Sequence, residues 1–216
     1  MAEDLDLSVA FDRTSEHEGE RIDTAGMKLR VKERLRRHEG WVNHMYLDTK
    51  GNVTVGVGFL LPRPDVGFYS WRHKKTKRTV PPPDAKAEWD YVSLLPHGQH
   101  IKAQEFDEET EFELSNATIG FALTKKLLRL RDQLNENFQK VDISFDQLPG
   151  SVQEAMFDMG WNLGAGFIKG DWPKLRAALT ARNWEAAAEE SHRASPIPET
   201  RNTEIYDLIK SATEDS

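Results

Sequence analysis

The chain has 216 residues, a formal net charge of -7 and a hydrophobic content of 38%, which suits one sizeable domain with or without an appended segment. It contains no cysteine, so a disulfide framework, a thiol nucleophile and a cysteine-ligated zinc are excluded. The acidic balance argues against a nucleic-acid partner, and the absence of a long apolar run argues against membrane insertion.

Residues 1–23 are expected to be a polar lead-in or a linker from a longer protein. They hold eight acidic residues, show little periodicity, and lack the basic and apolar regions of a signal peptide. We therefore expect the protein to be made in the cytoplasm without a signal peptide. If it acts elsewhere, another agent must carry it there.

A helix is predicted to follow, beginning at Thr24 as N-cap. Met27, Val31 and Leu35 are spaced four residues apart and form one apolar stripe, while Arg and Lys occupy the other face. Gly40 is a natural helix stop. These features predict an amphipathic helix that packs one face on a core.

Residues 44–60 change to strand character around a turn at residues 50–52, which predicts a β-hairpin. Residues 62–113 are irregular and rich in proline, charge and aromatic side chains. A structureless stretch of that length is unusual inside a compact domain, so an inserted subregion with some structure of its own is expected. Within it, Trp71 and Trp89 are either core residues or platforms for sugar stacking.

From Ser115 the pattern is helical, and the first of these helices carries a buried stripe of leucines. The stripe consists of Leu123, Leu127, Leu130 and Leu134. A hairpin lobe followed by a helical lobe is the α+β pattern, and residues 24–216 are expected to form this domain. The groove between such lobes is a usual place for a ligand.

Three helix starts are predicted in the second half of the chain. Ser151 and Glu154 have the spacing of a capping box. Asp171 and Pro173 can open the next helix, and another follows after Asn183.

Two carboxylates stand out at the junction between the first helix and the hairpin. Glu39 lies at the negative end of the helix, where a second negative charge is disfavoured, and a protonated glutamate can act as a general acid. Asp48 follows nine residues later, and Thr54 lies across the turn from it. An acid, a base and a hydroxyl that holds a water suit inverting glycoside hydrolysis, which needs carboxyls about 6.5–9.5 Å apart. Gly56 and Gly58 would let a flat substrate approach, although an ordinary helix-to-hairpin junction fits the same residues.

A resemblance to a known family favours the catalytic interpretation. The junction resembles the phage-type lysozymes, muramidases of glycoside hydrolase family 24, in which a helix ends in Glu-Gly, an acid follows nine residues later, and T-x-G-x-G begins six residues beyond that acid. The matching residues are Glu39, Gly40, Asp48, Thr54, Gly56 and Gly58. A second stretch, FDMGWNLGAGF at 157–167, resembles the family's F-Q-M-G-x-x-x-x-A-G-F segment. Residues 174–190 resemble its following helix pair, and Pro198 with Arg201 resembles a late P-x-R segment.

The resemblance implies a lysozyme-like fold, with a small β-hairpin lobe, a larger helical lobe and a catalytic cleft between them. It implies that Glu39 is the general acid, that Asp48 and Thr54 manage the attacking water, and that Arg201 holds Glu39 in place. The positions that line the glycan groove in the family are Gly58, Leu60, Phe157 and Asp158 here.

Two positions depart from the family pattern. Phe59 stands where the best-known member has a histidine that ion-pairs with an aspartate, so that pair is absent. Asp158 replaces a glutamine of the cleft, which exchanges a donor for an acceptor. His97 and His100 lack a further obvious ligand, so no metal site and no cofactor are expected.

The sequence therefore predicts a peptidoglycan hydrolase that cleaves the β-1,4 bond between N-acetylmuramic acid and N-acetylglucosamine. It would act as a monomer on glycan strands in the bacterial periplasm, delivered either as a phage endolysin through a holin or as an effector of a secretion machine such as the type VI system. An effector would also need an immunity protein, for which the insertion is a candidate binding place. The alternatives are a lytic transglycosylase and a module that only binds peptidoglycan.

Overall fold

The structure, a computed structural model, describes residues 24–214, and the expected lead-in at residues 1–23 lies outside them. The described residues divide into two compact units. One consists of residues up to Arg34 together with those from Leu128 onward, and the other of residues 35–127. The division falls within helices α1 (Thr24–Glu39) and α3 (Asn116–Gln139), and each unit is described by itself.

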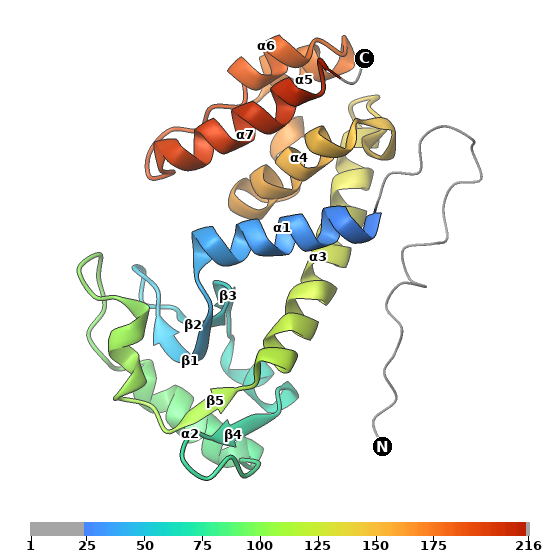
Figure 1. Cartoon of the computed structure of the whole chain (residues 1–216). Helices are drawn as coiled ribbons and strands as arrows, with labels where there is room; N and C mark the ends of the chain where they lie inside the picture. The colour runs from blue at the N-terminus through green and yellow to red at the C-terminus, as the bar shows by residue number, and fades with distance from the viewer. Residues whose placement is uncertain (1–23, 215–216) are drawn as a thin grey trace. The chain divides into compact units, whose positions relative to one another are not determined.

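The unit of residues 35–127 contains all the strands that the structure describes, together with short helices (Figure 1). Its elements between α1 and α3 are β1 (Val42–Leu47), β2 (Val53–Gly56), β3 (Phe59–Leu60), η1 (Arg63–Phe68), β4 (Trp71–His73), α2 (Pro82–Val92), η2 (Ala103–Asp107) and β5 (Phe112–Leu114). The strands form an antiparallel sheet in the order β1-β2-β3 and a separate antiparallel pair, β4-β5.

The predicted hairpin is present, but its second arm is two strands rather than one. Gly56 and Gly58 adopt left-handed backbone conformations, with φ of +70° and +67°, and turn the chain between β2 and β3. A strand cannot run straight through two such residues, because left-handed φ angles are incompatible with extended backbone. The turn returns β3 along β2, so that Thr54 pairs with both Tyr46 and Leu60.

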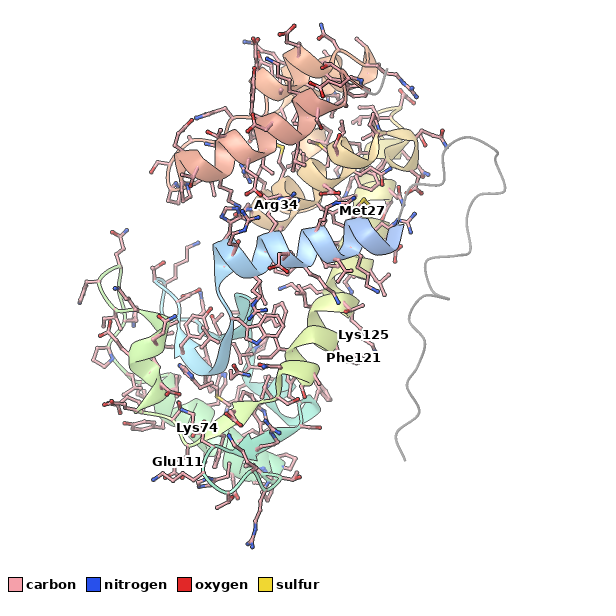
Figure 2. The ribbon with its side chains drawn as sticks, viewed as in Figure 1. Met27, Arg34, Lys74, Glu111, Phe121 and Lys125 are labelled. Carbon is pink, nitrogen blue, oxygen red and sulfur yellow. The ribbon has the colours of Figure 1, made fainter. Side chains whose placement is uncertain are left out.

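The inserted subregion has structure of its own, as expected. Strand β4 pairs with β5, and the backbone N–H of Lys74 continues the pairing by donating to the carbonyl of Glu111 at 2.8 Å (Figure 2). The insertion is fastened to β1 by His44, whose Nε2 lies 2.9 Å from the carbonyl oxygen of Ala103 and whose Nδ1 lies 3.1 Å from Asp107. It is therefore a folded extension of this unit.

The two insertion tryptophans belong to the packing of this unit. Trp71 is buried and its Nε1–H donates to the carbonyl of Val66 at 2.9 Å, so the sugar-stacking interpretation of Trp71 is wrong. Trp89 is half-buried and donates to the carbonyl of Leu61 at 2.7 Å. Indole N–H groups taken out of water need such acceptors, and both tryptophans find one in the chain segment after β3.

The other unit is helical in its described residues, and α4 to α7 gather together in Figure 1. Besides the parts of α1 and α3, its elements are η3 (Phe145–Gln147), α4 (Gly150–Leu163), η4 (Phe167–Lys169), α5 (Pro173–Thr180), α6 (Trp184–Glu189) and α7 (Glu199–Ser211). Edge-to-face aromatic contacts link Phe138, Phe145, Phe157, Phe167 and Trp172 in its core. The predicted stripes on α1 and α3 are buried, which confirms both amphipathic patterns.

The predicted capping box at α4 is wrong. The helix begins at Gly150 after Pro149 and has no side-chain cap. Ser151 Oγ is buried and makes no hydrogen bond with any residue that the structure describes. The Glu154 carboxylate is held by Arg30 at 2.7 Å and by Arg34 at 3.2 Å, so this acid serves an ion-pair cluster instead of the helix end.

The other two helix starts lie close to their predicted places. α5 opens with Pro173 in its first turn, although Trp172 rather than Asp171 holds the N-cap position. Asn183 caps α6, since its side-chain oxygen accepts the backbone N–H of Ala186 at 3.1 Å. Both units together give an α+β structure, and among residues 24–214 no helix is long and apolar enough to cross a membrane.

Candidate active site

Glu39 is the last residue of α1 and is half-buried. The helix stops there because Gly40 takes a left-handed conformation, with φ of +80°, while its N–H still donates to the carbonyl of Arg36 at 3.0 Å. This places the Glu39 carboxyl at the point where the chain leaves the helix and enters β1. Sequence and structure agree on this local geometry.

The two glycines of the T-x-G-x-G motif have different neighbours. A Cβ placed on Gly58 would lie 3.6 Å from Oε2 of Glu39, so the carboxyl of the helix end rests beside the turn between β2 and β3. A Cβ placed on Gly56 would lie 2.9 Å from the Phe59 ring, which is closer than a Cβ can approach, and at a tight 3.1 Å from Ile119. A side chain at Gly58 would therefore touch the carboxyl of Glu39 without overlap, whereas Gly56 leaves space that the packing of Phe59 needs.

Asp48 lies just beyond β1, and its carboxylate organises the hairpin turn. Oδ1 accepts the backbone N–H groups of Lys50 at 2.9 Å and Asn52 at 2.8 Å, and Oδ2 accepts the side-chain amide of Asn52 at 2.9 Å. Burial by itself would raise the pKa of Asp48, but these hydrogen bonds hold that pKa below its ordinary value. The group is therefore an ionised and weakly basic carboxylate at neutral pH.

Thr54 and Leu60 lie on one face of the three-stranded sheet with Tyr46, because directly paired residues point to the same side. Thr54 is buried, and its hydroxyl donates to the carbonyl of Asn52 at 3.0 Å. Since a hydroxyl that donates one hydrogen bond still has acceptor capacity, Thr54 can accept a hydrogen bond from a water. Leu60 is 59% exposed and Gly58 is also exposed, as positions that touch a ligand would be.

Tyr46 is a site residue that the sequence analysis missed. Burial, together with the negative charges of Glu39 and Asp48, raises the pKa of Tyr46 to about 12. One phenol therefore lies within electrostatic reach of both carboxyls and stays neutral at physiological pH. The available signal was its place two residues before Asp48, since alternate residues of a strand share a face.

Lys126 of α3 is the second residue that was missed. Its ammonium lies 4.9 Å from the centroid of the Phe59 ring, and the negative charge of Glu39 acts on it. No sequence pattern joins Lys126 to the junction around Glu39, because only the packing of α3 on the sheet brings them together. Phe59 itself is buried beside Gly58.

The remaining predicted site residues belong to the helical unit. Phe157 is buried in the aromatic core, in edge contact with Phe145. Asp158 is 2% exposed, and its carboxylate accepts hydrogen bonds from Arg193 at 2.7 Å and from Arg201 at 2.9 Å. Asp158 is thus held by two buried arginines. The predicted contact between Arg201 and Glu39 joins residues of different units and stays a prediction.

The residues that lie together in one unit are Glu39, Tyr46, Asp48, Thr54, Gly58, Leu60 and Lys126. Among residues 24–214, no group of three or more acidic or histidine side chains is arranged to hold a metal ion. The His97 ring instead packs against the turn at Gly51. The groups that these residues offer for chemistry are the carboxyl of Glu39, the ionised carboxylate of Asp48 and the neutral phenol of Tyr46, which is within electrostatic reach of both.

No model of a known protein family matches the chain, and no curated protein sequence matches it.

Proposed function

We propose that the protein is a lysozyme-type peptidoglycan hydrolase that cleaves the β-1,4 bond between N-acetylmuramic acid and N-acetylglucosamine with inversion. One observation carries the proposal. The carboxyl of Glu39 lies beside the exposed Gly58, while Asp48 and Thr54 belong to the hairpin that also contains this glycine. The resemblance of the motif residues to the phage-type lysozymes supports it and suggests a lysozyme-like fold with the glycan between the two lobes.

In this proposal Glu39 protonates the glycosidic oxygen, which makes the sugar a better leaving group. Asp48 stabilises the positive charge that develops on the sugar ring, and Thr54 accepts a hydrogen bond from the attacking water. Because the turn hydrogen bonds lower the pKa of Asp48, its contribution is more electrostatic than basic. The reaction needs no cofactor.

Clearing of permeabilised Gram-negative cells, followed as turbidity, tests the proposal. Glu39→Gln should lower the rate at least about 100-fold, because general acid catalysis contributes roughly that much or more. Asp48→Asn should also lower it, since the amide oxygen can still accept the turn N–H groups but carries no charge. The matched control is Glu33→Gln, which changes an exposed glutamate of the same helix. If the wild-type protein clears no faster than Glu39→Gln, the enzymatic proposal fails, and retention on purified sacculi would then indicate a binding module.

A lytic transglycosylase is the second candidate, because both oxygens of Asp48 already accept hydrogen bonds within the turn. Such an enzyme needs the acid but no carboxylate to manage a water. Mass spectrometry of the released muropeptides separates the reactions. Reducing muramic acid ends support hydrolysis, whereas anhydromuramyl ends would replace it with the transglycosylase reaction.

The setting proposed for this activity is the bacterial periplasm, reached either through a holin or through a secretion machine. The two settings imply different neighbours for the gene. A holin gene beside it would indicate an endolysin, and an immunity gene would indicate an antibacterial effector.

A further inference from the structure

Trp41, Asn43 and Asn116 form a hydrogen-bonded cluster at the surface of the unit of residues 35–127. The Trp41 Nε1–H donates to Oδ1 of Asn116 at 2.9 Å, and Nδ2 of Asn43 donates to the same oxygen at 3.0 Å. Nδ2 of Asn43 also donates to the carbonyl of Leu114 at 2.7 Å. Because Asn116 is exposed and the other two side chains are only half-buried, the cluster can be reached from solvent.

The two ends of this cluster fix the direction in which both amides point. An indole N–H can only donate a hydrogen bond, and a backbone carbonyl can only accept one. Asn116 must therefore turn its oxygen toward Trp41, and Asn43 must turn its nitrogen toward Leu114. This leaves Oδ1 of Asn43 as an acceptor and Nδ2 of Asn116 as a donor, and neither has a hydrogen-bond partner in the part of the chain that the structure describes. The two free groups stand at opposite ends of the joined amides.

Regular elements hold the three side chains in place. Asn116 is the first residue of α3, which begins directly after β5 (Figure 1). Asn43 lies in the stretch of β1 where the pairing with β2 shifts register, and such irregularities re-aim side chains. The Trp41 ring is held by its own hydrogen bond and by the guanidinium of Arg36, which lies over it at 5.4 Å. Groups that are already held in place lose little freedom when a ligand binds, which favours binding.

Gly120 leaves open space beside this cluster. It lies one helical turn after Asn116, on the same face of α3. Glycine inside a helix is destabilising relative to alanine. Crowding does not require it here, because a Cβ on Gly120 would meet no atom within 4 Å beyond the helix backbone itself. Bare backbone without a packing reason is typical of a place that a ligand approaches closely.

We propose that this cluster binds an N-acetylated amino sugar of the glycan strand, as a subsite that takes no part in the chemistry. Oδ1 of Asn43 would accept the acetamido N–H, and Nδ2 of Asn116 would donate to the acetamido carbonyl, while the acetyl methyl rests against the indole of Trp41. A secondary amide presents its donor and its acceptor on opposite sides, which matches the two free groups. The choice of an acetamido sugar rests on the proposed function, since both sugars of peptidoglycan carry this group.

Titration with the tetramer of N-acetylglucosamine tests the proposal, followed by NMR at the indole N–H of Trp41 and at the side-chain amides of Asn43 and Asn116. All the proteins carry Glu39→Gln, so that no sugar is cleaved and binding is measured separately from hydrolysis. The three signals should shift together with one Kd. Cellotetraose has the same β-1,4 linkage but hydroxyls in place of the acetamido groups. It should bind at least about 5-fold more weakly, because one hydroxyl cannot span both amides and lacks the methyl group.

Asn116→Asp is the sharpest variant. Its carboxylate still accepts both hydrogen bonds within the cluster, but an acceptor replaces the outward donor. Kd should therefore rise by at least about 3-fold, which corresponds to one lost hydrogen bond. The matched control is Ala117→Asp, which adds the same charge at the next, exposed position of α3 and leaves the cluster intact. Its Kd should equal that of the protein that carries Glu39→Gln alone.

Gly120→Ala separates a binding role from a structural one. It should raise Tm by about 1–4 °C, because alanine is the better helix former. It should nevertheless weaken sugar binding, because the added methyl group occupies the space beside the cluster. A cluster that only ties β1 to α3 would give the same gain in Tm with an unchanged Kd.

Shifts at the cluster that weaken in Asn116→Asp and Gly120→Ala, but not in Ala117→Asp, support the proposal. Unmoved signals with the acetylated tetramer, equal affinity for cellotetraose, or an unchanged Kd in a folded Asn116→Asp overturn it. If Asn116→Asp does not fold, Gly120→Ala decides by its Kd, since it is expected to be the more stable protein. Failure of the wild-type protein to clear cells would refute the hydrolase function, which is a different result from unmoved signals at the cluster.

Discussion

Three glycines around the candidate site share a left-handed backbone but differ in what a methyl group would meet. Their φ angles are +80° at Gly40, +70° at Gly56 and +67° at Gly58. A Cβ on Gly40 would meet nothing within 4 Å, one on Gly58 would lie 3.6 Å from the nearest atom, and one on Gly56 would lie 2.9 Å from the Phe59 ring. Alanine at each position therefore separates backbone strain from steric overlap.

The expected losses of stability follow from these contacts. An L-residue in the left-handed region costs about 1–2 kcal/mol, partly offset because alanine restricts the unfolded chain by about 0.4–1 kcal/mol. Gly40→Ala and Gly58→Ala should therefore cost about 1 kcal/mol each. Gly56→Ala adds overpacking of about 1–3 kcal/mol, because the buried Phe59 and Ile119 must move, and should cost about 2–4 kcal/mol in total.

Thermal and urea unfolding, followed by circular dichroism and tryptophan fluorescence, measure these differences. Each kcal/mol corresponds to a change in Tm of about 2–4 °C for a protein of this size. Cell clearing by Gly58→Ala should fall although its stability matches that of Gly40→Ala, because the added methyl group contacts the carboxyl of Glu39. Equal destabilisation by Gly56→Ala and Gly40→Ala would refute the steric role of Phe59. Unimpaired clearing by Gly58→Ala would refute the placement of Gly58 in the site.

Two further predictions concern the buried carboxyls of Glu88 and Asp158. Burial raises the pKa of Glu88 to about 7, although hydrogen bonds from the N–H groups of Glu111 and Phe112 act to lower it. Between about pH 4.5 and 7 the Glu88 carboxyl is therefore protonated in the folded state and ionised in the unfolded state. The free energy of unfolding should fall as pH rises through that window. Glutamine at position 88 does not titrate, so in Glu88→Gln the free energy of unfolding should fall less between pH 5 and pH 8 than in the wild-type protein, by at most about 3 kcal/mol. Urea unfolding at a series of pH values measures this, and the same pH dependence in both proteins would contradict the prediction. Asp158→Asn removes the buried carboxylate that Arg193 and Arg201 share and should cost about 3–5 kcal/mol, whereas a Tm equal to that of the exposed control Asp171→Asn would argue against the buried cluster.

Several local features of the chain follow from the sequence by itself. The apolar stripe from Met27 to Leu35, the helix stop at Gly40 and the turn at residues 50–52 all appear where the sequence predicts them. These features depend on interactions within a few residues, namely helical periodicity, left-handed glycine and turn hydrogen bonding. The positions of Glu39 and Asp48 alone also fitted an ordinary junction of helix and hairpin, and the resemblance to a known family was what favoured a catalytic site there.

Local rules failed where a side chain found a partner far along the chain. Glu154 was expected to cap its own helix, but Arg30 and Arg34 take its carboxylate. Asp158 was predicted to line the glycan groove, which stays a prediction, and the structure adds that its carboxylate pairs with Arg193 and Arg201. Charge-assisted hydrogen bonds between a carboxylate and a guanidinium are stronger than neutral ones, and sequence spacing does not reveal which distant arginine will supply them.

Contacts between distant segments also determined which residues join the candidate site. The sequence placed Glu39, Asp48 and Thr54 in one short stretch, which made them recognisable together. Only the tertiary structure brought Lys126 to Phe59 and placed Tyr46 within reach of both carboxyls. The chain determines which groups can do chemistry, whereas packing between distant segments determines the charges that surround them, because electrostatic interactions depend on distance in space and not on separation along the sequence.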